Sequence, residues 1–194
     1  MKTLGLTGGI GMGKSTAAEI LRTLSVPVVD TDDLARQQVQ PGKPALAEIS
    51  AAFGKNILTA DGHLRRDELA RLVFTDPIAR EKLEAILHPV IRTAWLAQIE
   101  IWRAENHPLA VVVIPLLFET HAESHFDKII CVTCSCATQH ERLLARGWNP
   151  EQIRQRRAAQ WPVEQKIGRA DFVIWTEGTL SAHEQQLRQI LRFS

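Results

Sequence analysis

The 194-residue sequence has few cysteines, almost no net charge and no long apolar run. Its cysteines, Cys131, Cys134 and Cys136, are an odd and sparse set, which argues against a disulfide framework and for a reducing compartment. Their CxxCxC spacing resembles a zinc motif, but no fourth ligand stands at a standard spacing. Residues 128–134 have instead the pattern of a buried strand, in which cysteine serves as a small hydrophobic side chain.

Membrane and nucleic-acid partners are excluded on similar grounds. No apolar run approaches the roughly 20 residues of a spanning helix, and the N-terminus, with a single Lys and then Gly5, has no apolar signal segment. A formal net charge of +1 gives no overall field that attracts nucleic acid. We therefore expect a soluble, cytoplasmic protein.

Short apolar runs, often β-branched, alternate with longer helical stretches. This alternation predicts an α/β protein of three layers, with a parallel sheet covered by helices on both faces. The chain length fits one domain with excursions. The predicted strands are residues 3–7, 26–29, 110–114, 128–133 and 172–174.

Two excursions interrupt this pattern. Residues 31–107 contain amphipathic stretches at 45–53, 66–74 and 77–103. This segment is too long for an ordinary crossover between strands. We therefore interpret it as a helical insert that holds a second substrate. Residues 139–167 are rich in arginine and break near Gly147, which predicts a helical hairpin. We expect this hairpin to be a lid over phosphates, the alternative being a solvated helix face. The predicted nucleotide-binding core is then residues 1–30, 108–138 and 168–194.

Residues 8–15 match the pattern GxxxxGK[ST] between an apolar stretch and a helix-like run, the context that a phosphate-binding loop requires. Glycines there let backbone N–H groups turn toward phosphate oxygens, Lys14 reaches the β- and γ-phosphates, and the Ser15 hydroxyl can ligate Mg²⁺. The alternative is a glycine-rich turn with an incidental lysine. The predicted nucleotide contacts are Gly8, Gly9, Ile10, Gly11, Met12, Gly13, Lys14, Ser15 and Thr16.

Acidic residues follow the second predicted strand. If the extended conformation persists, Asp30 and Asp32 project from one face, so one can hold Mg²⁺ through water and the other can accept a proton from an attacking hydroxyl. Alternatively an aspartate, Asp33 above all, caps a helix that starts near Leu34. The third strand lacks a terminal Asp, so metal ligation rests on Ser15, water and an acidic group such as Asp30 or Glu119. That absence favours a small-molecule kinase over a GTPase switch or a motor ATPase.

Taken together in order and spacing, these motifs resemble the dephospho-CoA kinase family. The resemblance implies a P-loop kinase that uses ATP and Mg²⁺ to phosphorylate the ribose 3′-hydroxyl of dephospho-CoA, the last step of coenzyme A synthesis. The alternatives are a kinase of nucleosides or nucleoside monophosphates, and a regulatory nucleotide-binding protein. The matching residues are 5–11 and 13–16, Asp30-Thr31-Asp32 with Ala35-Arg36, Asp61-Gly62 with Arg65-Arg66 and Leu69, His88-Pro89, residues 115–119, Gln139 with Arg142-Leu143 and Arg146, Arg156 with Gln160, and Ala170-Asp171.

The resemblance also implies roles for single residues. It makes Asp32 the general base and leaves Asp30 a metal or positioning role. It assigns Lys14 and Arg142 to catalysis and Arg146 to nucleotide binding. The implied acceptor contacts are Thr7, Asp32, Arg66, His88, Leu116 and Leu117.

At three positions the assignment of these roles is limited. For His88 the alternative is that it breaks a helix together with Pro89, with its imidazole bonded to a backbone carbonyl. Met12 stands where the family usually has Ser, at a position expected to contribute its backbone amide. Thr176 stands where an Asn is common, so no adenine contact is assigned there.

Overall fold

The computed structural model describes residues 1–193 and forms two compact units. One consists of residues 1–30 together with the chain from residue 99 onward, and the other is Thr31–Gln98. The second unit begins where the helical insert was predicted to begin. The assignment of a substrate to each part of the chain stays a prediction.

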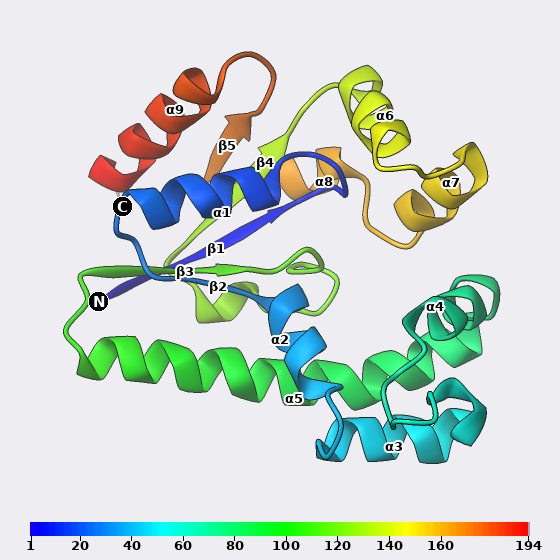
Figure 1. Ribbon diagram of the computed structural model, residues 1–194. Coiled ribbons are helices and arrows are strands. Elements are labelled where there is room, and N and C mark those ends of the chain that lie inside the picture. The colour runs from blue at the N-terminus through cyan, green and yellow to red at the C-terminus, as the bar shows by residue number, and fades with distance from the viewer. Residues whose placement is uncertain (194) are drawn as a thin grey trace. The chain divides into compact units, whose positions relative to one another are not determined.

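The first unit is built on a five-stranded parallel sheet (Figure 1). Its strands are β1 (Lys2–Gly8), β2 (Val28–Asp30), β3 (Leu109–Val113), β4 (Lys128–Thr133) and β5 (Phe172–Trp175), in the order β2-β3-β1-β4-β5. The five predicted strands and the α/β class are confirmed, although β2 starts and ends later than the apolar run 26–29. Because all strands run in parallel, their carboxyl ends share one edge, where open α/β sheets bind ligands.

Helices and loops cover both faces of this sheet. On one face, Leu4 and Leu6 of β1 pack in a buried core with α1 (Lys14–Thr23) and α9 (Leu180–Phe193). Residues of β1 alternate between faces, so Gly5 lies on the other side, where an added Cβ would stand 2.6 Å from Cδ1 of Leu117. The short helix α8 (Val163–Ile167) packs against β1 and β4. These three layers confirm the expected architecture.

The arginine-rich segment forms the predicted hairpin. Helix α6 (Cys136–Ala145) begins after Ser135, whose hydroxyl accepts a hydrogen bond from the Thr138 N–H. Helix α7 (Pro150–Ala158) begins with a capping box between Asn149 and Gln152. These caps satisfy N–H groups that a helix start leaves without partners, which explains why the chain breaks between the two helices.

The second unit is helical. Its helices are α2 (Thr31–Gln38), α3 (Pro44–Phe53), the 3₁₀ turn η1 (Lys55–Ile57), α4 (Arg66–Thr75) and α5 (Pro77–Ala104), which continues into the first unit; a second 3₁₀ turn, η2 (Glu123–His125), lies in the first unit. Leu46, Ile49 and Leu69 form its buried core. The three amphipathic stretches are thus confirmed as helices. The alternative that His88 breaks a helix together with Pro89 is wrong, because both residues lie inside α5 and the helix continues past them.

The cysteines behave as small core residues where they lie on the sheet. Cys131 on β4 and Cys134, just after it, are buried free thiols, whereas Cys136 is exposed at the start of α6. Burial raises the pKa of the Cys131 thiol to about 11, so this sulfur stays protonated at neutral pH. Among residues 1–193 no three His, Cys, Asp or Glu side chains are grouped to hold a metal ion. None of the helices described combines the length and apolar character of a membrane span.

Candidate functional site: a phosphate-binding loop at the carboxyl edge of the sheet

The loop between β1 and α1 has a backbone that only glycine allows. Gly8 has φ +148°, and a Cβ there would lie 2.2 Å from the carbonyl oxygen of Val132. Gly13 has φ +99° and precedes α1 directly. Neither an acidic residue in the first turn nor a capping side chain occupies this helix start. Its N–H groups and the positive end of its dipole therefore favour an anion.

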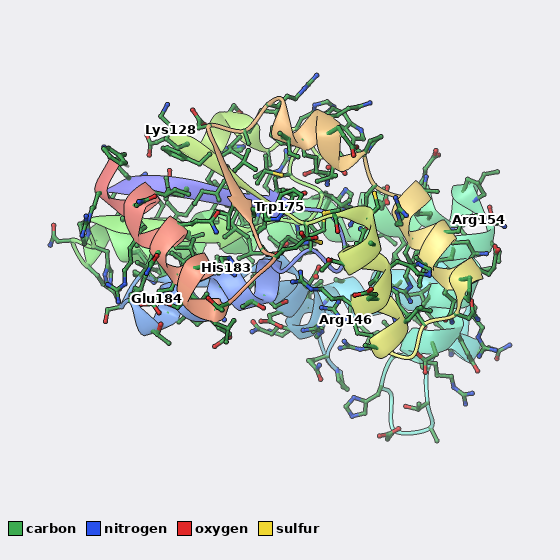
Figure 2. All side chains as sticks on the ribbon, turned by 90° about the horizontal axis from the view of Figure 1, so that it is seen from above. Lys128, Arg146, Arg154, Trp175, His183 and Glu184 are labelled. Carbon is green, nitrogen blue, oxygen red and sulfur yellow. The ribbon has the colours of Figure 1, made fainter. Side chains whose placement is uncertain are left out.

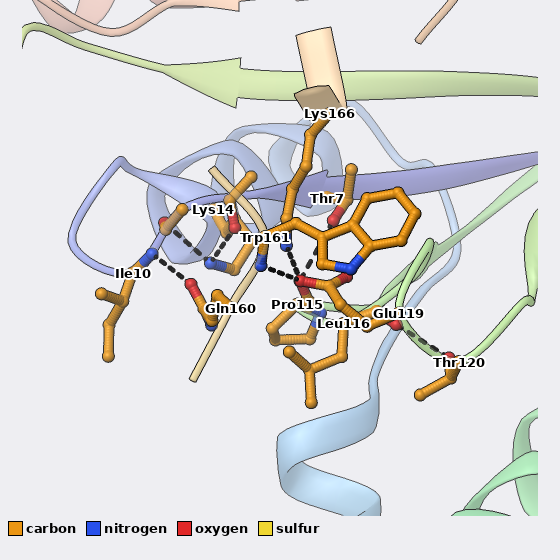
Figure 3. Close-up of polar contacts among 12 residues, drawn as sticks. Thr7, Ile10, Lys14, Pro115, Leu116, Glu119, Thr120, Gln160, Trp161 and Lys166 are labelled. Atoms are coloured by element: carbon orange, nitrogen blue, oxygen red, sulfur yellow. Dashed lines mark hydrogen bonds and ion pairs between the residues drawn. The ribbon is translucent and has the colours of Figure 1, made fainter. Parts of the chain in front are cut away.

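Lys14 carries its charge into this loop. Its Nζ donates hydrogen bonds to the carbonyl oxygens of Gly8 at 2.9 Å and Gly9 at 3.0 Å (Figure 3). Ser15 is exposed in the first turn of α1, and Thr16 follows it. A cation, a hydroxyl and a helix N-terminus are thus gathered in one loop, the set that phosphate oxygens and Mg²⁺ require.

The hairpin segment holds the tip of this loop from both sides. The Ile10 N–H donates to Oε1 of Gln160 at 3.0 Å, after α7, and the Ile10 carbonyl accepts from Nε2 of Gln139 at 2.8 Å, on α6. The Met12 N–H donates to the Gly9 carbonyl at 3.3 Å, and its side chain is buried. The amides of Ile10 and Met12, both predicted to face phosphate, thus have protein partners in this structure.

A cavity of about 300 Å³ adjoins the loop. Arg142 forms part of its wall and donates to Oγ1 and O of Thr176 at 2.9 and 2.7 Å. The Thr176 hydroxyl in turn donates to the Met12 carbonyl at 3.0 Å. The structure therefore brings the predicted lid residues and the loop together. The residues that line the cavity include Gly11, Gly13, Thr16, Arg142, Arg146, Thr176 and His183.

His183 adds a neutral polar group to this cavity (Figure 2 shows it on α9, and Arg146 directly after α6). Burial lowers the pKa of His183, and the nearby charge of Arg142 lowers it further. Its Nε2 is buried without a hydrogen-bond partner among residues 1–193. The cavity wall thus pairs an imidazole with the Arg142 guanidinium, a pairing that local sequence patterns do not signal.

The segment after β3 lies beside the end of β1. The Thr7 hydroxyl donates to the carbonyl of Pro115 at 3.3 Å, and Leu117 is buried against Gly5 while Leu116 is half-buried. Glu119, a candidate metal ligand in the sequence, has its Oε1 2.7 Å from Nζ of Lys166 and accepts the Trp161 N–H at 2.9 Å. Its carboxylate is thus engaged by an interior lysine.

The acidic residues after β2 are arranged differently from the prediction. Asp30 is the last residue of β2, at the sheet edge that carries the loop, but α2 begins at Thr31. The alternation that would place Asp30 and Asp32 on one strand face therefore stops before Asp32, and that prediction is wrong. Asp33 lies within the first turn of α2 and pairs with Arg36, so it does not cap a helix that starts at Leu34.

Three predicted acceptor residues belong to the second unit. Arg66 begins α4 and donates to the Arg36 carbonyl at 3.4 Å, which places it beside α2, the helix that carries Asp32. His88 is half-buried on α5. Burial lowers the pKa of His88, which favours a neutral imidazole. Their contact with an acceptor stays a prediction.

Sequence reasoning gave no role to the hydrogen bonds of Gln139, Gln160, Thr176 and Lys166. The two glutamines stand out in the sequence only as motif residues. Lys166 stands in the polar stretch Val163–Ile167, which is typical of an exposed helix. A polar residue that stays buried among such neighbours leaves no periodic signal, so these contacts emerge only from the fold.

This chain is similar to proteins of known family. The sequence model described as dephospho-CoA kinase matches residues 2–182. A dephospho-CoA kinase of Bdellovibrio bacteriovorus is 45% identical over 174 residues, 90% of this chain and 87% of that protein. Two solved structures are also similar. One from Thermus thermophilus has a TM-score of 0.82 at 33% identity, covering 99% of this chain and 97% of that one. The dephospho-CoA kinase from Campylobacter jejuni has a TM-score of 0.72 at 28% identity, covering 99% and 96%. The match spans the loop, the insert and the hairpin alike, and the chain belongs to the dephospho-CoA kinase family.

Proposed function

We propose that this protein transfers the γ-phosphoryl group of ATP to the ribose 3′-hydroxyl of dephospho-CoA, giving coenzyme A and ADP. The observation that carries the proposal is the position of Lys14, whose ammonium lies inside a glycine-bounded loop at the start of α1. Membership of the dephospho-CoA kinase family over residues 2–182 supports the identity of the acceptor.

The loop and the arginines on and directly after α6 bind the nucleotide in this reaction. Residues 8–16 bind the phosphates through backbone N–H groups, and Lys14 stabilises the negative charge on the transferred group. The amides of Ile10 and Met12 join this cradle by exchanging their present partners for phosphate oxygens. Arg142 and Arg146 line the adjoining cavity and brace the phosphates as the hairpin closes.

The donors around the loop fit a magnesium ion. Mg²⁺ prefers hard oxygen ligands and keeps several waters, so an exposed Ser15 hydroxyl with one nearby carboxylate suits it without a cluster of acids. Ser15 would hold the ion directly, and Asp30, at the same sheet edge, would hold it through water. The bound ion supplies charge neutralisation at the β- and γ-phosphates.

The acceptor side of the reaction is assigned residue by residue. Asp32 accepts the proton of the ribose hydroxyl as the bond to phosphorus forms, and so acts as the general base. Thr7, Leu116 and Leu117 line the acceptor at the sheet. Arg66 and His88 also contact the acceptor. The free thiols of Cys131, Cys134 and Cys136 support a reducing, cytoplasmic location.

An acceptor comparison tests this function. ADP release is measured with ATP and Mg²⁺ in the presence of dephospho-CoA, adenosine or a nucleoside monophosphate, and coenzyme A is quantified in the first arm. We expect only dephospho-CoA to stimulate ADP release, with coenzyme A formed in equal amount. Stimulation by a monophosphate alone would refute the proposed acceptor.

The Lys14→Ala variant tests the loop in the same assay. Removing the ammonium deletes an electrostatic stabiliser of the transferred group, so we expect kcat to fall on the order of 10²-fold or more. Because Lys14 is only half-buried and faces the loop, circular dichroism and the melting temperature should stay near those of the wild type. A folded Lys14→Ala protein with wild-type turnover would rule out the phosphate-binding role.

A further inference from the structure

Lys166 is a fully buried lysine, with an exposed fraction of 0%. An ammonium is costly to remove from water unless it is paired and hydrogen-bonded. Its Nζ lies 2.7 Å from the Pro115 carbonyl oxygen and 2.7 Å from Oε1 of Glu119 (Figure 3). Both partners belong to the segment directly after β3, whereas Lys166 belongs to α8, at the end of the hairpin segment.

The two acceptors of Lys166 are themselves shared. The Pro115 carbonyl also accepts from the Thr7 hydroxyl, and Thr7 precedes Gly8, whose carbonyl receives the Lys14 ammonium. Oε1 of Glu119 also accepts the Trp161 N–H. The neighbouring Gln160 accepts the Ile10 N–H at the tip of the phosphate-binding loop. One buried ammonium thus joins three segments: the start of the loop, residues 115–119 and residues 160–166.

We propose that the Lys166–Glu119 pair is a positioning device for phosphoryl transfer. It fixes the C-terminal base of the hairpin against the segment after β3, and this holds the phosphate-binding loop and residues 115–117 at a constant spacing while the hairpin moves. Lys166 is a positioning residue, because it acts through Pro115 and Glu119. This inference rests on the proposed function, in which residues 115–117 line the acceptor.

The energetics of a buried ion pair favour a positioning role over a purely stabilising one. A buried ion pair contributes little net stability compared with apolar residues of the same volume, because desolvation offsets the attraction. A pair with directed hydrogen bonds does, however, fix the geometry of the groups it joins. Small displacements of reacting groups are costly in phosphoryl transfer, and a lid with a loose base admits water to the phosphate.

The test uses the double variant Lys166→Met/Glu119→Gln. It removes both charges together, leaves no unpaired buried ion, and keeps an oxygen for the Trp161 N–H. The matched control is Lys128→Met/Asp171→Asn, which removes a lysine–carboxylate pair of 2.8 Å at the opposite, N-terminal end of β4 (Lys128 is labelled in Figure 2). Coenzyme A formation and ADP release are measured together at saturating substrates.

We expect the Lys166→Met/Glu119→Gln enzyme to form coenzyme A about 10-fold or more slowly and to release more than one ADP per coenzyme A, with the KM for ATP nearly unchanged. Partial unfolding would lower both products and leave their ratio at one. The control should keep the wild-type rate and a ratio of one.

A folded double variant with wild-type kcat and a ratio of one overturns the proposal. Should that variant fail to fold, Lys166→Arg keeps the charge in a different shape. It is expected to raise the same ratio, and a ratio of one in that variant overturns the proposal equally. Failure of the proposed function is distinct, because the wild type would then form no coenzyme A from dephospho-CoA.

Discussion

At the scale of single residues, Asp30 and Asp32 are two positions apart but belong to different elements. Asp30 ends β2 at the edge that carries the phosphate-binding loop, and Asp32 lies in the first turn of α2. Their side chains therefore do not share the alternation of one strand, and their proposed roles need separate tests. Substitution by asparagine keeps the size and hydrogen bonding of each side chain but removes the charge.

We predict that Asp32→Asn lowers kcat by about 10² to 10⁴, the usual contribution of a general base, while ATP affinity is retained. Asparagine can still orient the ribose hydroxyl but cannot accept its proton. Raising the Mg²⁺ concentration should not restore activity to this variant. Steady-state kinetics and nucleotide titration measure both quantities.

For Asp30→Asn we predict partial recovery as Mg²⁺ is raised, because the variant weakens a water-mediated metal contact and leaves the base in place. An activity titration against Mg²⁺ compares it with Asp32→Asn. Rescue at Asp32 and none at Asp30 would show that the two roles are exchanged. Wild-type activity in both variants would remove these residues from the active site.

Arg142 on α6 and Arg146, the residue directly after α6, both line the cavity beside the loop but differ in surroundings. Arg142 is held by two hydrogen bonds to Thr176, whereas Arg146 is exposed. We predict that Arg142→Ala lowers kcat at saturating ATP by about 10-fold or more, because a guanidinium held in the cavity wall can stabilise developing charge with little reordering. Arg146→Ala should chiefly raise the KM for ATP.

The control for these variants is Arg154→Ala on α7, an exposed arginine paired with Glu151 (labelled in Figure 2). A solvated arginine should leave kcat and KM unchanged. If Arg142→Ala behaves like this control, Arg142 belongs to the wall of the site and takes no part in catalysis.

At the scale of elements, one aspartate joins the N-terminal ends of two neighbouring strands. Asp127, just before β4, accepts hydrogen bonds from the N–H of Thr3 at 2.7 Å and from its hydroxyl at 3.1 Å. These bonds from Thr3, the N–H first, hold the pKa of Asp127 below its ordinary value of 3.8. Ionised Asp127 thus ties the start of β4 to the start of β1, at the end of the sheet away from the phosphate-binding loop.

We predict that Asp127→Asn destabilises the protein at neutral pH and leaves kcat unchanged. A carboxylate whose pKa is lowered on folding stabilises the fold above the unfolded value of 3.8, and this stabilisation is lost as the pH falls through the lowered value. The difference in unfolding free energy between wild type and variant should therefore shrink on acidification. Urea titrations at several pH values measure it, and a constant difference would contradict the prediction.

The elements also show where local sequence patterns suffice. The strands and amphipathic helices follow from periodicity, and the loop follows from glycines whose backbone allows no other residue, such as Gly8 and Gly13. The start of α2 at Thr31, directly after the end of β2 at Asp30, was not predicted, because the apolar run 26–29 gives no sign of it. The burial of Lys166 was missed because its partners, Pro115 and Glu119, are distant in sequence and no local pattern links them.

At the scale of the whole molecule, the chain divides its chemistry between two compact units. The phosphate-binding loop, Arg142 and Arg146 lie in the unit that contains the sheet, whereas Asp32, Arg66 and His88 lie in the helical unit, residues 31–98. The predicted insert, residues 31–107, begins where the helical unit begins and extends past its end at residue 98, and that it holds the acceptor stays a prediction. A ligand that binds only the folded state protects the backbone it contacts from local opening, so the two substrates should protect different segments of the chain.

We predict that ATP with Mg²⁺ slows hydrogen exchange at residues 8–16 and along α6. Dephospho-CoA should slow it around residues 115–117 and within residues 31–98, above all in α2, α4 and around His88. Mass spectrometry of the full chain, with each substrate alone, measures this protection. The Lys14→Ala protein is the control, since it should lose most of the ATP-dependent protection and keep that of dephospho-CoA. Protection by dephospho-CoA confined to the sheet unit would show that the helical unit does not bind the acceptor, and the base would then have to be sought among residues of the sheet unit.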